Sequence, residues 1–77
     1  MDKYRPLQQF LEKCKGQTVT LTYEQMEGII GGKLPMSAHK YPAWWANGGH
    51  YYADSWLEVG WRVDEVRFSE SVTFKKQ

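Results

Sequence analysis

The sequence predicts an α+β fold, in which a three-stranded antiparallel sheet carries two to three helices packed on one face. Three observations support this class. Two N-terminal segments place apolar residues at helical spacing, a short β-branched segment lies between them, and two strand-like segments close the chain. A third helical segment precedes those last strands, so the expected order is α-β-α-α-β-β.

The N-terminal half contains the clearest local signals. Apolar side chains recur at helical spacing over Pro6–Lys15, which predicts the first helix. Thr18–Leu21 alternates polar and apolar side chains and is rich in β-branched residues, which predicts a strand. The second helix is expected to run from Thr22 to Ile30, because Thr22 and Gln25 have the spacing of a capping box.

The C-terminal half is less regular. Met36–Lys40 is expected to be a loop or a short helical turn, and His50–Val59 to be the third helix. Trp61–Phe68 alternates like a strand but contains one residue too many at its centre, Asp64-Glu65, which predicts a β-bulge or a bend. Val72–Phe74 is the last strand. The final two strands should form a hairpin, to whose edge the first strand adds.

The expected core combines one face of each helix with one face of the sheet. It consists of Leu7, Leu11, Val19, Leu21, Met26, Ile29, Ile30, Ala53, Trp56, Leu57, Val63, Val66 and Phe74.

Length and composition limit the classes of protein. We expect residues 1–77 to form a single domain, because the chain is too short for two. A single cysteine cannot form an internal disulfide, which favours a reducing, cytoplasmic location. No apolar run reaches the roughly 20 residues that a membrane span needs, and the N-terminus lacks a signal-peptide core, so no membrane partner is expected. The chain is expected to be a monomer or a homodimer.

The segment Lys33–Trp56 stands out for its chemistry. It contains three of the four tryptophans and both histidines, and no acidic residue lies between Glu27 and Asp54. We interpret it as a partly exposed, weakly basic aromatic surface. The candidate contact residues are Lys33, Ser37, His39, Lys40, Tyr41, Trp45, Asn47, His50 and Tyr51, together with Arg62 from the following strand.

Nucleic acid, and DNA first, is the partner that these side chains suit best. Tyr41 and Trp45 could stack on bases, which contributes about 1–3 kcal/mol per base. Lys33, Ser37 and Lys40 could contact phosphates. Asn47 and His50 could recognise the ligand through hydrogen bonds, and Asn47 could also read adenine in a major groove. This interpretation expects Lys33, Lys40 and Arg62 to share one face with Tyr41 and Trp45. The formal charge of this segment is only about two, from Lys33 and Lys40, so any such binding should be weak, strongly salt-dependent or limited to one short feature.

A protein partner is the alternative. Exposed Trp and Tyr side chains are enriched at interface hot spots, as in a protein-interaction module or in an inhibitor or accessory protein of a phage or bacterial defence system. An enzyme is not expected, because no nucleophile, base and acid show the spacing of a known motif. No cofactor and no metal are expected, because no closely spaced ligand pairs are present.

A structural role in the core is the alternative interpretation of the tryptophans, against both binding functions. Trp44, Trp56 and Trp61 are large enough to build the core of a small domain. Trp44 and Trp45 are adjacent, so we expect only one of them to face the core fully, and Trp45 is the one expected at the surface.

Several short motifs together resemble a small bacterial domain family of unknown function, DUF7662. The resemblance spans nearly the whole chain and implies the same fold, but it implies no activity. It rests on Tyr4-x-Pro6-Leu7, Leu21-Thr22-Tyr23, Met26-Glu27-x-Ile29-Ile30-Gly31, Leu34-Pro35-x-Ser37-Ala38, Ala43-Trp44-Trp45-Ala46-Asn47, Ala53-x-x-Trp56-Leu57-x-x-Gly60-Trp61-x-Val63 and Val72-Thr73-Phe74.

Overall fold

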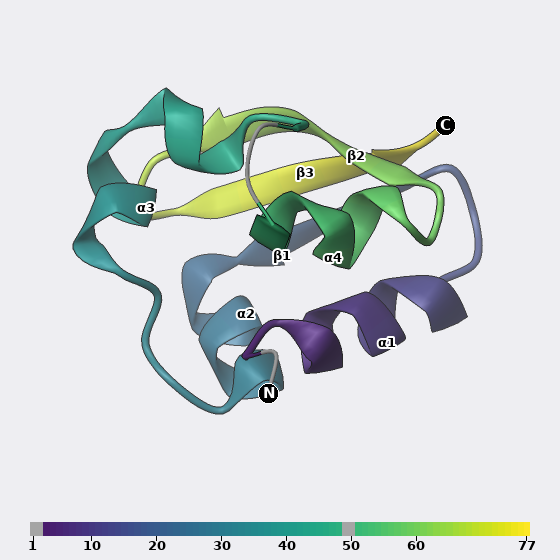
Figure 1. Ribbon diagram of the computed structural model, residues 1–77, viewed down its shortest axis with the longest axis horizontal. Helices are drawn as coiled ribbons and strands as arrows, with labels where there is room; N and C mark the ends of the chain where they lie inside the picture. The colour runs from purple at the N-terminus through teal and green to yellow at the C-terminus, as the bar shows by residue number, and fades with distance from the viewer. Residues whose placement is uncertain (1–2, 49–50) are drawn as a thin grey trace.

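A computed structural model describes residues 3–48 and 51–77, with the exception of the Tyr51 side chain. The α+β class and the order α-β-α-α-β-β are confirmed (Figure 1). The elements are α1 (Arg5–Lys13), β1 (Thr18–Thr22), α2 (Tyr23–Ile30), α3 (Met36–Lys40), the 3₁₀ turns η1 (Pro42–Trp45) and η2 (Tyr51–Ala53), α4 (Asp54–Leu57), β2 (Trp61–Arg67) and β3 (Ser71–Lys76).

Helix α2 has the ends that the sequence predicts. The Thr22 hydroxyl accepts from the backbone N–H of Gln25 at 3.0 Å, and the Gln25 side chain accepts from the backbone N–H of Thr22 at 2.8 Å. This complete capping box satisfies two N–H groups that the first turn leaves unpaired. At the other end Gly31 adopts a left-handed conformation with φ of 74°, which glycine tolerates without strain.

The other two predicted helices are longer in the prediction than in the structure. Helix α1 ends at Lys13 rather than Lys15, because Cys14 is already extended. The expected helix His50–Val59 is instead two pieces, η2 and α4, and helical structure ends at Leu57. His50 lies outside the described residues.

None of the helices in residues 3–48 and 51–77 has the length and apolar character needed to cross a membrane.

The sheet has the strand order β1-β3-β2, and both pairings are antiparallel. The C-terminal hairpin is therefore confirmed, and β1 pairs with its β3 side. Val63 lies opposite Phe74, but Glu65 lies opposite Thr73, the next residue of β3. Asp64 is thus the extra residue of a β-bulge, as the slip in the apolar pattern predicts.

The two faces of the sheet differ in chemistry. Leu21, Val63, Val72 and Phe74 point into the core, where Figure 1 shows α1, α2 and α4 packed over the sheet. The opposite face presents a hydroxyl row on β1, and the Thr20 and Thr73 hydroxyls share a hydrogen bond of 2.9 Å there. Helix α3 lies beyond the end of the sheet, on the side of the β2–β3 turn. The molecule therefore has two layers, with α3 at one end.

Most of the predicted core is confirmed. The residues Leu7, Leu11, Leu21, Met26, Ile30, Ala53, Trp56, Val63 and Phe74 are buried. Val19, Ile29, Leu57 and Val66 are only partly buried and pack against its outside, which corrects the prediction for these four. Their place is taken by aromatic side chains, because Tyr4, Tyr23, Trp44, Trp45 and Trp61 are all buried.

Candidate binding surface

Trp45 is part of the core, which corrects its expected position at the surface. Only 3% of the residue is exposed, and its indole Nε1 donates to the carbonyl oxygen of Ala38 at 2.8 Å. Trp44 is also buried, with 9% exposed, and the two rings meet edge to face at 4.6 Å. Both rings are buried although they are adjacent in the 3₁₀ turn η1, because each is covered by its own aromatic partners. Trp45 therefore cannot stack on a ligand without local unfolding.

The buried tryptophans belong to a larger aromatic cluster. Trp44 stacks on Tyr52 at 4.4 Å and meets Tyr4 edge to face at 5.8 Å. Trp45 stacks on Trp56 at 6.1 Å. Such ring pairs contribute about 0.5–1.5 kcal/mol each beyond the area they bury. The aromatic residues of Lys33–Trp56 therefore serve mainly to stabilise the core of the domain and less to form a binding surface.

Asn47 also has a structural role, although its position was predicted to contact a ligand. Its Oδ1 accepts from the backbone N–H of Val63 at 2.8 Å and from Trp56 Nε1 at 3.0 Å. Its Nδ2 donates to the Val63 carbonyl at 3.0 Å. The side chain thus pairs with β2 as a neighbouring strand would, and it fixes the Trp56 ring. Both polar atoms of the Asn47 side chain are thus bonded to the domain itself.

His39 joins α3 to the β2–β3 turn. Its Nδ1 lies 2.8 Å from the Ser69 hydroxyl, and its ring packs on Tyr23 at 4.8 Å between centroids. Ser69 has a φ of 63°, a conformation that is uncommon for residues other than glycine. The Tyr23 hydroxyl donates to Ala38 O at 2.7 Å. Burial raises the pKa of Tyr23, while hydrogen bonds from the Ser69 backbone and the Trp45 side chain act in the opposite direction.

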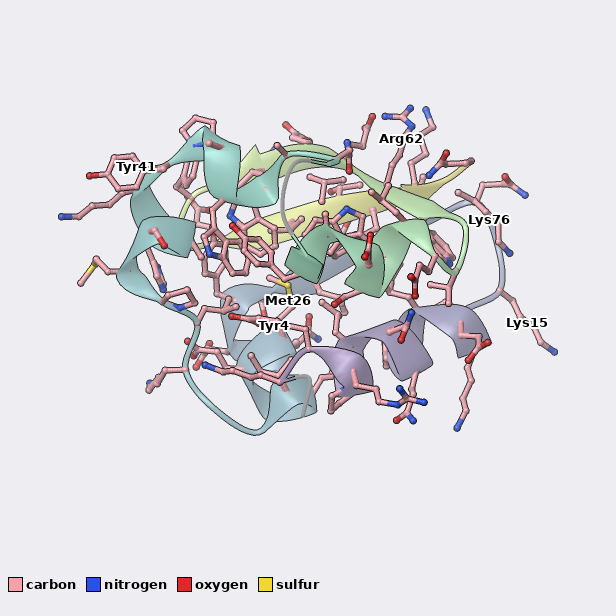
Figure 2. The ribbon with its side chains drawn as sticks, viewed as in Figure 1. Tyr4, Lys15, Met26, Tyr41, Arg62 and Lys76 are labelled. Carbon is pink, nitrogen blue, oxygen red and sulfur yellow. The ribbon has the colours of Figure 1, made fainter. Side chains whose placement is uncertain are left out.

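Three exposed residues at this end of the molecule form what we call the α3 surface: Met36, Lys40 and Tyr41. Met36 is 67% exposed and Tyr41 59%, the two highest values among the large hydrophobic side chains described. Lys40 is exposed as well, and it lies one helical turn after Met36. Figure 2 shows Tyr41 at the outer margin of the molecule, pointing away from the core. This is an aromatic ring beside a cation, open to a ligand.

The remaining predicted contact residues are spread more widely. The Lys33 side chain is 92% exposed, and its Nζ lies 3.9 Å from a Glu27 carboxylate oxygen. Ser37 is partly buried, and its carbonyl accepts from the N–H of Tyr41 at 2.9 Å, which closes α3. His50 and the Tyr51 side chain lie outside the described part of the structure. Lys33 and Lys40 thus remain available to a ligand by exposure.

Arg62 does not lie with the other candidates. Figure 2 shows it on the sheet, at the opposite end of the molecule from Tyr41. Its Nη1 is 3.3 Å from the Asp64 carboxylate. The expected single face that joins Arg62 to Lys40 and Tyr41 is therefore not formed, because Arg62 lies at the start of β2 and this strand approaches α3 only at its other end, where the β2–β3 turn contacts His39.

Two residues near this surface were missed by sequence reasoning. Ser69 contacts His39, which lies far away in the sequence, and no rule based on residue spacing predicts such a contact. Only the turn-forming residues around Ser69 indicated its place in a turn. Met36 was placed in a loop or a short helical turn and was given no role. Within the described residues, no group of three or more His, Cys, Asp or Glu side chains is placed to hold a metal ion.

Comparison with known proteins identifies the family of the chain and no function. No curated protein and no solved structure matches it. A family model described as a domain of unknown function, DUF7662, matches residues 4–77. This range includes all the motifs on which the resemblance rests, from Tyr4 to Phe74, and it covers every helix and strand described above. The chain therefore belongs to the DUF7662 family.

Proposed function

We propose that this chain is a small, non-catalytic binding module whose α3 surface contacts nucleic acid, with DNA as the first candidate. The supporting observation is Tyr41, an aromatic side chain that is 59% exposed and lies next to the exposed Lys40. Exposing so large a ring forgoes the burial that stabilises the other aromatic residues of this domain. A ligand that covers the ring would recover this contribution.

The chemistry of the α3 surface suits a short, unpaired stretch of nucleic acid. A base stacks on an aromatic ring independently of its identity, and a lysine contacts the neighbouring phosphate. No acidic residue occurs between Glu27 and Asp54, so the segment around Tyr41 itself carries no negatively charged side chain. One ring and few cations predict weak binding with a shallow but measurable salt dependence.

A protein partner is the second candidate, and Met36 is the observation that favours it. An exposed methionine is a flexible apolar contact, and tyrosine is enriched at interface hot spots. An inhibitor or accessory protein of a phage or bacterial defence system, acting in the cytoplasm, would use such a patch. This candidate predicts binding that depends little on salt and is lost on Met36→Ala as well as on Tyr41→Ala.

Fluorescence anisotropy of labelled single- and double-stranded DNA and RNA oligonucleotides tests the proposal, at low and at physiological salt. We expect saturable binding to single strands that weakens with salt. Tyr41→Ala should weaken it about fivefold or more, as the loss of one stacked base implies. Tyr41→Phe keeps the ring and should bind like the wild type.

Phe10→Ala is the matched control, because Phe10 is an exposed aromatic on α1, away from the α3 surface. It should leave binding unchanged. Trp45→Ala is not a test of the surface, since it removes a buried ring. Absence of binding to every oligonucleotide at low salt would reject nucleic acid and direct the search to proteins.

A further inference from the structure

The two edges of the sheet differ in how far their backbone N–H and C=O groups are protected. Because the strand order is β1-β3-β2, both β1 and β2 are edge strands (Figure 1). An edge strand presents unpaired backbone N–H and C=O groups that can pair with another chain. Proteins usually block such an edge with charges, prolines, bulges or a covering segment.

The β2 edge is blocked. Val63 points its backbone N–H and C=O away from β3, and the Asn47 side chain bonds both. The outward carbonyl of Trp61 accepts from Gln77 Nε2 at 3.3 Å. The bulge at Asp64 then interrupts the strand, and charged side chains follow it. A second strand cannot pair along this edge without displacing Asn47.

The β1 edge is open. Lys76 N donates to Gln17 O at 2.8 Å and Tyr23 N to Glu70 O at 3.0 Å, which sets the alternation of the β1–β3 ladder. It follows that Thr18 and Thr20 direct their N–H and C=O groups outward, away from β3. Within the described residues no hydrogen bond reaches these outward groups.

The side chains of β1 do not protect it either. The strand Thr18–Thr22 has no charged residue, no proline and no bulge, and its three threonines are exposed. Only Thr22 is protected, because Gln25 accepts from its N–H in the capping box. The β1 edge therefore lacks, at Thr18 and Thr20, the protection that the β2 edge has.

We propose that β1 is a self-association edge that pairs antiparallel with β1 of a second copy of this chain. With Val19 opposite Val19 about a two-fold axis, Thr18 of each copy lies opposite Thr20 of the other. This register uses every outward group of both threonines and leaves Thr22 unpaired, as its cap requires. The half-buried Val19 side chains meet at the axis and lose their remaining exposure.

The charges that flank β1 favour a second copy in this orientation. Lys15 precedes the strand and Glu24 follows it, and both are exposed. Antiparallel pairing brings the Lys15 end of one copy to the Glu24 end of the other, whereas parallel pairing would place like charges together. The uncharged strand between them adds no repulsion between identical chains. This proposal is independent of the α3 surface.

Sedimentation velocity across a wide range of protein concentration tests it. We expect a reversible monomer–dimer equilibrium for the wild type. Thr20→Pro removes an outward N–H without touching the β1–β3 ladder, so it should raise the dimer dissociation constant about tenfold or more. Thr20→Val loses the same hydroxyl contact to Thr73 but keeps the N–H, and it should dimerise like the wild type.

A second variant covers the case in which Thr20→Pro fails to fold. Thr18→Lys with Thr20→Lys places like charges directly opposite across the proposed axis, on the solvent-facing side of the sheet, and should give a folded monomer. Tyr41→Ala should leave the dimer unchanged. A wild type that stays monomeric at every concentration overturns the proposal, and so does a dimer that survives in the folded edge variants.

Discussion

At the scale of single residues, Asn47 shows how a polar side chain can be mistaken for a ligand contact. It joins η1, Trp56 and β2 through three hydrogen bonds of 2.8–3.0 Å. An asparagine beside tryptophans suggests recognition of a base when only the sequence is considered. The structure shows instead that the amide is used by the domain itself.

Asn47→Ala should therefore destabilise the fold. It leaves the Trp56 indole N–H and both backbone groups of Val63 without their partners, which costs about 2–4 kcal/mol in the free energy of unfolding. Denaturant unfolding of Asn47→Ala and of the wild type measures this difference in the free energy of unfolding. Asn47→Asp retains an acceptor for two of the bonds and should lose less. Equal stability of Asn47→Ala and wild type would show that the amide is dispensable.

Ser55 predicts a change in the opposite direction. Its hydroxyl is buried, with 2% of the residue exposed, and it has no hydrogen-bond partner among the described residues. Burying an unpaired hydroxyl is unfavourable, and alanine is the better helix former. Ser55→Ala should thus stabilise the protein by about 0.5–2 kcal/mol in the same assay. A loss of stability would mean that the hydroxyl has a partner in solution.

Tyr23 predicts a dependence of stability on pH. Burial raises its pKa, so the fold favours the neutral phenol. The unfolded chain, with a tyrosine pKa of about 10, then loses its proton first as the pH rises. This contribution to stability is complete below about pH 10 and is lost as the pH rises through the folded pKa.

Tyr23→Phe removes that ionisation and should flatten the loss of stability above pH 10. At neutral pH it should cost only about 0.5–1.5 kcal/mol, because Ala38 O keeps its bond from Trp45. Unfolding midpoints between pH 8 and 11 measure both effects. Tyr41→Phe is the control, since it removes a hydroxyl from a tyrosine that is exposed. An unaltered alkaline slope in Tyr23→Phe would contradict the assignment.

At the scale of elements, the correct predictions came from sequence signals that lie within the element itself. Helix α2 was predictable because its capping box and Gly31 lie within the segment they terminate. The bulge in β2 was predictable because an extra residue shifts the alternation of side chains along the strand. The division of the third helix into η2 and α4 was not, because it depends on how α4 packs between α1 and β2 rather than on its own residues.

The contact between α3 and the β2–β3 turn predicts how Ser69 responds to substitution. Ser69→Ala loses the His39 bond and keeps the positive φ. Ser69→Gly loses the same bond but relieves the backbone strain. We expect the glycine variant to be more stable than the alanine variant by about 1 kcal/mol in denaturant unfolding. The reverse order would show that this turn carries no strain.

At the scale of the whole molecule, aromatic composition was the signal most easily misinterpreted. The segment Lys33–Trp56 is rich in aromatic residues because this small domain builds its core from rings, with Trp44, Trp45 and Trp56 all buried. Which rings remain outside depends on the direction of α3 and η1 relative to the sheet, and no periodicity encodes that direction. Among the described aromatic side chains that were predicted to stack on a ligand, Tyr41 is exposed and Trp45 is buried.

The most direct measurement is the ¹⁵N–¹H correlation spectrum of the protein during titration with a short single-stranded DNA at low salt. Binding at the α3 surface predicts that the largest shift changes fall on Met36, Lys40, Tyr41 and their neighbours, and that Tyr41→Ala needs a higher DNA concentration to produce them. Shift changes concentrated on the sheet around Arg62, or no changes at all, would contradict the proposed site.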